Sequence, residues 1–309
     1  MRAAVVRTFG GPDAVEIAEV PVPEPGAEQV RIKVAAGALN PVDAGVRAGF
    51  FGGAGKTLGL GWDVAGTVDA VGVAAAWQVG DPVVALVPGV AEPLGAHAEY
   101  VVVGAGAVAK APAGVDAVHA GTLPLNGLTA LQALDLLDLA PGASLLVTGA
   151  AGAVGAFAVQ LAAHRGIEVT GHARAGDEEL VRSLGAVGFT AEGGLPGSVD
   201  AVLDAAVLGE PALEWVRDGG AYLGVHPGAQ PGPVRGVRTG AVEVAADGAQ
   251  LAELVRLVEA GVLTLRVAET YALEEAAKAH ARLAEGGLRG RVGVGGGRGG
   301  GGGGRGGGG

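Results

Sequence analysis

A glycine-rich turn with the spacing G-x-x-G-x-x-G follows the apolar run Leu145–Val147. The residues after the turn, AFAVQLAAH, have helical composition, and a second strand-like run occupies 167–173. In a strand–turn–helix unit, glycine lets the backbone approach a pyrophosphate, and the helix N-terminus offers N–H groups and positive potential. The sequence therefore predicts a dinucleotide-binding site. Its predicted contacts are Gly149, Gly152, Ala153, Val154 and Gly155.

The end of the second strand-like run discriminates between nicotinamide cofactors. A site for NADH usually places Asp or Glu there, to accept hydrogen bonds from the ribose hydroxyls. Here the residues are TGHAR, ending at Arg174, and none of them is acidic. A guanidinium at that position is suited to a 2′-phosphate. We therefore predict that the cofactor is NADPH, the alternative being that Arg174 is an ordinary solvated side chain.

A second glycine-rich stretch, GGAGKT at 52–57, resembles an ATP phosphate loop. That loop requires a glycine, four further residues and then Gly-Lys-Ser/Thr. Counting back from Gly55, the required glycine position holds Phe50. The flanking residues predict neither a buried strand before the loop nor a helix after it. We interpret this stretch as a surface loop, with Lys56 in solvent.

Composition excludes several functional classes. The net charge of −11 argues against a general nucleic-acid binder, because little positive charge is available to displace counterions. The absence of cysteine removes disulfides, thiolate nucleophiles and Cys-ligated zinc. No apolar run approaches the roughly 18 residues of a membrane span, and the N-terminus lacks the apolar stretch of a signal peptide. We expect a cytoplasmic protein that binds neither nucleic acid nor membrane.

Two textures divide the chain. Up to about residue 118, short Val-rich runs separated by Gly and Pro predict a small barrel or sandwich. From Ala120, strand-like and helix-like segments alternate, with PALEWVRDGG among the helix-like ones, which indicates βαβ units on a parallel sheet. Two amphipathic helices follow. The remaining residues, 295–309, are nearly all Gly and predict a disordered tail; an RNA-binding segment is the alternative, because Arg298 and Arg305 interrupt it.

Several motifs along the chain match one family in order. They are MRAAVVRTFGGPDAVEI, ALNPVDAGVRAG, GWDVAGTVDAVG, VGDPVVAL, AHAEYVVV, LPLNGLTALQAL, VTGAAGAVG, RSLGA and GGLRGRVGV. The chain resembles the zinc-independent medium-chain dehydrogenases/reductases, specifically the NADPH:quinone oxidoreductase or zeta-crystallin group. The resemblance runs to about Val294.

The resemblance implies an α/β fold with a GroES-like β-barrel catalytic domain and a Rossmann domain, a doubly wound parallel sheet, inserted into it. The implied boundaries are 1–119 for the first part of the catalytic domain, 120–248 for the NADP-binding domain and 249–294 for the return to the catalytic domain. It also implies an active site in the cleft between the domains, a small-molecule substrate and a homodimer.

Site residues follow from the matched motifs. Asn40 and Asp43 form the N-x-x-D element that lines the cofactor end of the cleft in this family, and Thr129 lies near the nicotinamide. Gly224, Val225 and His226, at the end of the strand-like run AYLGV and just after it, would lie beside the same ring. As hydrogen-bond donors to the negative charge that develops on substrate oxygen, we predict Asn40, Thr129 and His97. The predicted substrate pocket contains Asp43, Gly45 and Trp62.

Two positions, Gly45 and His97, are unusual for this group, and a third stretch separates the chain from the zinc-dependent relatives. Many quinone reductases carry a tyrosine where this chain has Gly45, so we expect a roomier pocket and a missing hydroxyl donor. His97 stands where the family often has an aromatic residue; it either faces substrate or packs at the barrel edge. Zinc-dependent relatives carry Gly-His-Glu where this chain has Gly61-Trp62-Asp63, so we predict no active-site metal.

Three functions fit these features. The first is an NADPH-dependent reductase of quinones or α,β-unsaturated carbonyls that uses no zinc. The second is a biosynthetic tailoring enzyme on the same scaffold, either a trans-acting enoyl reductase or a catalyst of a non-redox step such as cyclisation. The third is a nucleotide-binding protein without turnover. The sequence does not name the substrate.

Overall fold

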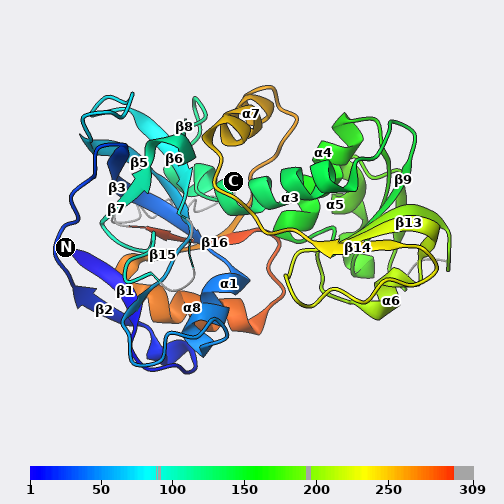
Figure 1. Cartoon of the computed structure of the whole chain (residues 1–309), viewed down its shortest axis with the longest axis horizontal. Coiled ribbons are helices and arrows are strands. Elements are labelled where there is room, and N and C mark those ends of the chain that lie inside the picture. The colour runs from blue at the N-terminus through cyan, green and yellow to red at the C-terminus, as the bar shows by residue number, and fades with distance from the viewer. Residues whose placement is uncertain (88, 90–91, 193–195, 296–309) are drawn as a thin grey trace, which may run out of the picture.

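The computed structural model describes residues 1–87, 89, 92–192 and 196–295. Figure 1 shows two bodies side by side, a β-rich body that contains the N-terminus and an α/β body built on the middle of the chain. The predicted α/β fold, a GroES-like barrel domain plus a Rossmann-type parallel sheet, is confirmed.

The β-rich body corresponds to the predicted catalytic domain, a name kept for it below, and its last strands come from 267–295. Its strands are β1 (Arg2–Val6), β2 (Glu16–Glu19), β3 (Gln29–Leu39), β4 (Leu58–Gly59), β5 (Asp63–Val71), β6 (Pro82–Leu86), β7 (Tyr100–Gly104), β8 (Val108–Lys110), β15 (Val267–Ala272) and β16 (Arg291–Gly295). Its helices are α1 (Pro41–Ala48), α2 (Ala117–Ala120) and α8 (Ala276–Glu285). The larger sheet has the order β15-β16-β3-β5-β6-β8, with β7 also paired to β3.

Alternating Val and Ile side chains form a hydrophobic core in this body. In the first half of β3, buried residues alternate with more exposed ones, as expected for a strand with one face on a core. Val30 and Ile32 pack in one cluster with Val64 and Val83 from the neighbouring strands. At the other end, β16 pairs with β3 in antiparallel register, Val292 opposite Leu39. The return segment is therefore built into the catalytic sheet.

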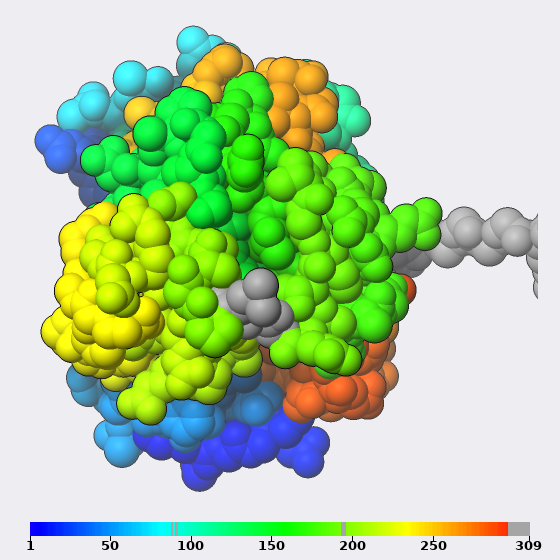
Figure 2. Space-filling view, turned by 90° about the vertical axis from the view of Figure 1, so that its right-hand side faces the viewer, coloured from blue at the N-terminus to red at the C-terminus, as the bar shows by residue number. Residues whose placement is uncertain are grey.

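The α/β body carries a parallel six-stranded sheet. Its strands are β9 (Ser144–Thr148), β10 (Glu168–His172), β11 (Gly188–Thr190), β12 (Val199–Asp204), β13 (Val216–Gly224) and β14 (Arg238–Ala241). Its helices are α3 (Pro124–Leu137), α4 (Ala153–His164), α5 (Glu178–Ser183) and α6 (Glu210–Leu213), and the later helix α7 (Gly248–Glu259) packs against both α3 and β8. The strand order is β11-β10-β9-β12-β13-β14, so the winding reverses between β9 and β12. Figure 2 shows this body from its outer side, with the catalytic domain behind it.

Helix α3 joins the two bodies. It packs against α4 and α7 and also against β5 and β6 of the catalytic domain. Nearly all of its residues are buried, which explains why its sequence is apolar on every side. Asn126 and Thr129 are its buried polar side chains, and Asn126 bonds to Asn40 and Arg291 of the β-rich body.

All six strands of the parallel sheet lie within 120–248, and β15 and β16 begin within 249–294. The exact domain boundaries stay a prediction. The expected tail begins one residue too early, because Gly295 belongs to β16; the rest of it lies outside the described residues.

Two further expectations concern single segments. PALEWVRDGG was expected to be helical, but α6 ends at Leu213 and β13 starts at Val216, with Gly219 and Gly220 inside that strand. The loop at 50–57 is flanked by α1 and the two-residue strand β4, so it has no strand–loop–helix arrangement, and Lys56 is exposed as predicted. Among the helices that the structure describes, none is long and apolar enough to cross a membrane.

Candidate active site

The glycine turn lies at the carboxyl end of β9, beside β12, where the strand order reverses. Gly149 has a φ of 59°, in the left-handed region that favours glycine, and Gly152 N–H donates to Gly149 O at 2.8 Å. A Cβ on Gly155 would lie 2.2 Å from Gly149 O, so α4 can approach the turn this closely only with glycine there. Parallel sheets bind ligands at such a reversal, and the turn fits a dinucleotide pyrophosphate.

Arg174 is exposed just beyond the end of β10. Within the described part of the chain its guanidinium makes no hydrogen bond or ion pair. The nearby carboxylate of Asp177 is buried and lies 2.6 Å from Nε of Arg289, which comes from the return segment. Arg174 is therefore available for an anion.

A second concave region lies at the carboxyl ends of β12 and β13. It brings together Gly224, Val225 and His226, which the sequence placed beside the nicotinamide. Asp204 in its wall is fully buried and accepts hydrogen bonds from Thr148 Oγ1 and Tyr222 OH, both at 2.6 Å. These bonds tie β9, β12 and β13 together, and the phenol's burial and its bond to Asp204 raise the pKa of Tyr222. The edge that would hold a nicotinamide is thus rigid.

The N-x-x-D element caps helix α1. Asp43 N–H donates to the backbone carbonyl of Asn40 at 3.0 Å, and Asp43 Oδ2 accepts from Asn40 N–H at 2.8 Å, so the two residues close the first turn of the helix reciprocally. Asp43 Oδ1 accepts from Gly61 N–H at 2.7 Å. Asp43 is completely buried, and burial raises its pKa. Asp43 therefore fixes the start of α1 against the segment before β5.

The Asn40 amide belongs to a buried polar network that joins both domains. Its Nδ2 donates to Asp63 Oδ2 at 2.6 Å, and its Oδ1 accepts from Asn126 Nδ2 at 3.0 Å. Arg291 Nη2 donates to Asn126 Oδ1 at 2.5 Å, and Leu125 N–H donates to Asp63 Oδ1 at 2.6 Å. Asn40 is 1% exposed, and both ends of its amide are engaged. Its predicted role as a donor to substrate stays a prediction and would require release from Asp63.

Burial controls the charges of this network. It raises the pKa of Asp63 to about 7, which the bonds from Leu125 and Asn40 only partly oppose. Burial also lowers the pKa of Arg291 to about 10. Near neutral pH the Asp63 carboxyl group is therefore partly protonated.

The other two predicted donors are also engaged. Thr129 Oγ1 donates to Leu125 O, one helical turn earlier, at 2.6 Å, so its lone pairs remain free while its proton does not. His97 is 2% exposed, with Nε2 at 3.1 Å from Ala38 O and Nδ1 buried without a partner among the described residues. This geometry matches the packed-histidine alternative, and a contact of His97 with substrate stays a prediction.

Comparison with known proteins identifies the architecture. Residues 26–113 match the alcohol dehydrogenase GroES-like domain, and residues 176–293 match the family described as zinc-binding dehydrogenase. A quinone oxidoreductase from Pseudomonas aeruginosa is 31% identical over 310 residues, which cover 89% of this chain and 94% of that protein. The chain belongs to the medium-chain dehydrogenase/reductase family, in its quinone oxidoreductase group.

Further relatives in this oxidoreductase family agree. The chloroplastic NADPH-dependent alkenal/one oxidoreductase of Arabidopsis thaliana is 37% identical over 254 residues, covering 77% of this chain; the match spans 66% of that relative, just under two thirds of its length. The solved quinone oxidoreductase of Coxiella burnetii superposes with a TM-score of 0.82 at 26% identity, covering 95% of this chain and 98% of that one.

Gly45, where many quinone reductases carry tyrosine, packs beside two phenylalanines. A Cβ on Gly45 would lie 2.9 Å from Cε2 of Phe51 and 3.6 Å from Cδ2 of Phe50. The Phe51 ring therefore takes part of the space that a side chain at this position would need, and the roomier pocket stays a prediction. Trp62 is half-buried against the core that includes α3 and α4.

The family description mentions zinc, but the side chains described here are not arranged for it. Across residues 1–87, 89, 92–192 and 196–295, no group of three or more His, Asp or Glu side chains is placed to hold a metal ion. Asp63 stands where zinc-dependent relatives carry glutamate, and its carboxylate accepts hydrogen bonds from Asn40 Nδ2 and Leu125 N–H.

Sequence reasoning missed Asp63, Asn126 and Arg291 as parts of the site. Asp63 and Asn126 lie inside motifs that carried the resemblance, GWD and LNGLTA, and Arg291 lies in GGLRGRVGV. The available signal was a polar residue placed among apolar ones inside each motif.

Proposed function

We propose that this protein is an NADPH-dependent reductase of quinones or α,β-unsaturated carbonyl compounds that works without zinc. The observation that carries the proposal is the glycine turn at the reversal of the parallel sheet, together with Arg174 after β10, which has no partner among the described residues, and the lack of an acid at 170–174. The printed functions of the Arabidopsis and Pseudomonas relatives, alkenal/one and quinone oxidoreductases, support the substrate class.

The turn and Arg174 would bind opposite ends of the adenosine half of the cofactor. The first N–H groups of α4, from Ala153 and Val154, have no partner within the helix and would receive the pyrophosphate. Arg174 would receive the 2′-phosphate that distinguishes NADPH from NADH. An acid at the same place would repel that phosphate, so its absence favours NADPH.

At the other end, residues of both domains would orient the nicotinamide. A bound reduced nicotinamide supplies a hydride. Thr129 keeps free lone pairs and would accept from the carboxamide N–H₂. Gly224, Val225 and His226 would line the other side of the ring. The apolar surroundings of α3 and Trp62 would exclude water from the reacting carbon.

Zinc-independence rests on chemistry rather than on an empty site. A catalytic zinc needs about three protein ligands, usually Cys, His or a carboxylate. The chain has no cysteine, and the carboxylate of Asp63 is fully buried and already accepts two hydrogen bonds. Backbone N–H groups and solvent would then stabilise the negative charge on substrate oxygen. We also propose that the functional form is a homodimer.

The test is isotope transfer from NADPH deuterated separately on each face of C4, with an enone as acceptor. We expect one labelled face alone to deliver deuterium to carbon in the product. Conversion of the enone that proceeds equally well without nicotinamide would reject the hydride mechanism in favour of a non-redox step. Tight NADPH binding without turnover of any quinone or enone would favour the non-catalytic alternative.

A further inference from the structure

Arg266 connects the catalytic domain to the glycine turn of the other domain. It stands immediately before β15, and its backbone carbonyl accepts from Arg291 N–H of β16 at 3.0 Å. Gly290, with a φ of 140°, permits this close approach, because a Cβ there would lie 3.0 Å from both Ala268 N and Arg266 O. The base of the Arg266 side chain is therefore fixed to the catalytic sheet.

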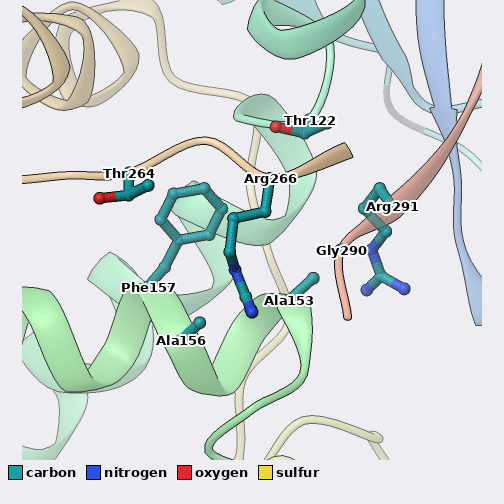
Figure 3. A pocket seen from close by; sticks show the side chains of 8 residues that line it. All are labelled: Thr122, Ala153, Ala156, Phe157, Thr264, Arg266, Gly290 and Arg291. Atoms are coloured by element: carbon teal, nitrogen blue, oxygen red, sulfur yellow. The ribbon is translucent and has the colours of Figure 1, made fainter. Parts of the chain in front are cut away.

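The guanidinium reaches across the domain contact. Its Nη2 donates to Ala151 O at 2.9 Å and to Gly152 O at 3.0 Å, both within the glycine turn. Figure 3 shows the side chain extending from its strand toward the first turn of α4, beside Ala153 and Phe157. One long side chain of the catalytic domain thus holds two successive peptide groups of the nucleotide-binding turn.

The held carbonyls determine where the neighbouring N–H groups point. In a trans peptide the C=O and the following N–H face opposite ways. Fixing Ala151 O and Gly152 O on the Arg266 side therefore directs the N–H groups of Gly152 and Ala153 away from it. Gly152 N–H is used within the turn, bonding Gly149 O, whereas Ala153 N–H begins α4 and has no partner within the helix.

The charge of Arg266 interacts with the Asp177 carboxylate at longer range but is not paired with it. It makes no ion pair among the described residues, and its Nη1 is buried without a hydrogen-bond partner. A cation on the carbonyl side of a peptide polarises that peptide and strengthens its N–H as a donor. The guanidinium therefore adds positive potential to the turn as well as fixing its geometry.

We propose that Arg266 is a positioning residue for the dinucleotide, holding the glycine turn so that the N–H groups of α4 face the pyrophosphate. This inference rests on the proposed dinucleotide site. It differs from the role of Arg174, because the pyrophosphate is common to NADPH and NADH while the 2′-phosphate is not. Arg266 should therefore act on both cofactors equally.

The experiment compares Arg266→Met with Arg235→Met. Arg235 also donates to two backbone carbonyls, Val216 O at 2.9 Å and Leu213 O at 3.0 Å, but it does so at the amino end of β13, away from the glycine turn. Dissociation constants for NADPH and NADH are measured by titration, and melting temperatures are measured without ligand. 2′-AMP, which carries no 5′-phosphate, serves as a third ligand.

We expect Arg266→Met to weaken NADPH and NADH by the same factor, about tenfold, as for loss of charge-assisted hydrogen bonds. 2′-AMP binding and the Arg235→Met constants should stay within about twofold of wild type. Arg266→Lys, which keeps the charge, should recover part of the loss, and it carries the test if the Met variant does not fold.

Wild-type constants for both cofactors in Arg266→Met would overturn the inference, as would a loss confined to NADPH. Equal loss of affinity in Arg235→Met and Arg266→Met would assign the effect to general destabilisation and overturn it too. If the wild-type protein itself binds neither cofactor, the proposed function fails, which is a separate result.

Discussion

Two polar regions meet at the domain contact, and they use their hydrogen-bonding groups in opposite ways. At the glycine turn, the first N–H groups of α4 have no partner within the helix. Nearby, the guanidinium of Arg174 has no partner among the described residues. In the network around Asn40, Asn40 Nδ2 donates to Asp63 and Asn126 Nδ2 donates to Asn40, and all three side chains are buried. Groups that are free of hydrogen bonds can receive a ligand, whereas groups that are already bonded within the protein fix its geometry. The first region is therefore suited to binding and the second to holding the two domains in register.

The largest expected effect concerns the pH dependence of the second region. The pKa of Asp63 is about 7 in the folded protein and near 3.8 in the unfolded chain, so its protonated form is favoured by folding. The stability it contributes is present below about pH 4 and is lost as pH rises to about 7, by roughly 4 kcal/mol at 1.36 kcal/mol per pKa unit.

Asp63→Asn should remove this dependence, because an amide keeps a polar side chain of the same shape without titrating. Unfolding free energies of wild type and variant at pH 5 and pH 8 give the measurement. If the difference in unfolding free energy between wild type and variant is the same at pH 5 and pH 8, Asp63 is not a buried titrating group.

Asn40→Ala should lower stability by about 3 kcal/mol, because it leaves Asp63 and Asn126 with unmade bonds in a buried site. Chemical denaturation measures this, and NADPH titration of the folded variant should give a nearly wild-type constant. An unchanged unfolding free energy combined with a large fall in turnover would instead show that Asn40 faces substrate, as its sequence motif predicted.

Gly155→Ala should disturb the first region. The new Cβ would meet Gly149 O at 2.2 Å, so the turn or α4 must move. We expect a loss of about 2 kcal/mol in stability, in the range of overpacking, and weaker binding of both NADPH and NADH. Gly104→Ala is the matched control, because nothing lies within 4 Å of its Cβ position and its φ is −61°. Equal behaviour of the two variants would show that the turn is not tightly packed.

The parts of this structure that were predictable from sequence are the local ones. The glycine turn, the parallel sheet and α3 follow from spacing and periodicity within a few residues. PALEWVRDGG misled because its helical composition is overridden after Leu213 by pairing of β13 with β12. Sequence patterns predicted Asn40 as a site residue, but they did not predict the residues that hydrogen-bond to its side chain.

Those partners could not be read from local patterns. Asn40 bonds to residues 23 and 86 positions away, and Arg291 reaches Asn126 across 165 positions. The filling of the Gly45 position by Phe51 depends likewise on how the loop after α1 folds back. Whether a polar group is already hydrogen-bonded or is available to a ligand depends on contacts that form only in the folded protein, and this difference separates the two regions.

The most direct test of the account is the affinity of wild type and Arg174→Ala for NADPH and NADH. Arg174 is exposed and unpaired, so its replacement should leave the fold intact. We expect wild type to prefer NADPH, and the variant to lose about 1–2 kcal/mol of NADPH binding while its NADH constant is unchanged. A wild-type preference for NADH, or equal NADPH binding by both proteins, would contradict the assignment of Arg174 to the 2′-phosphate.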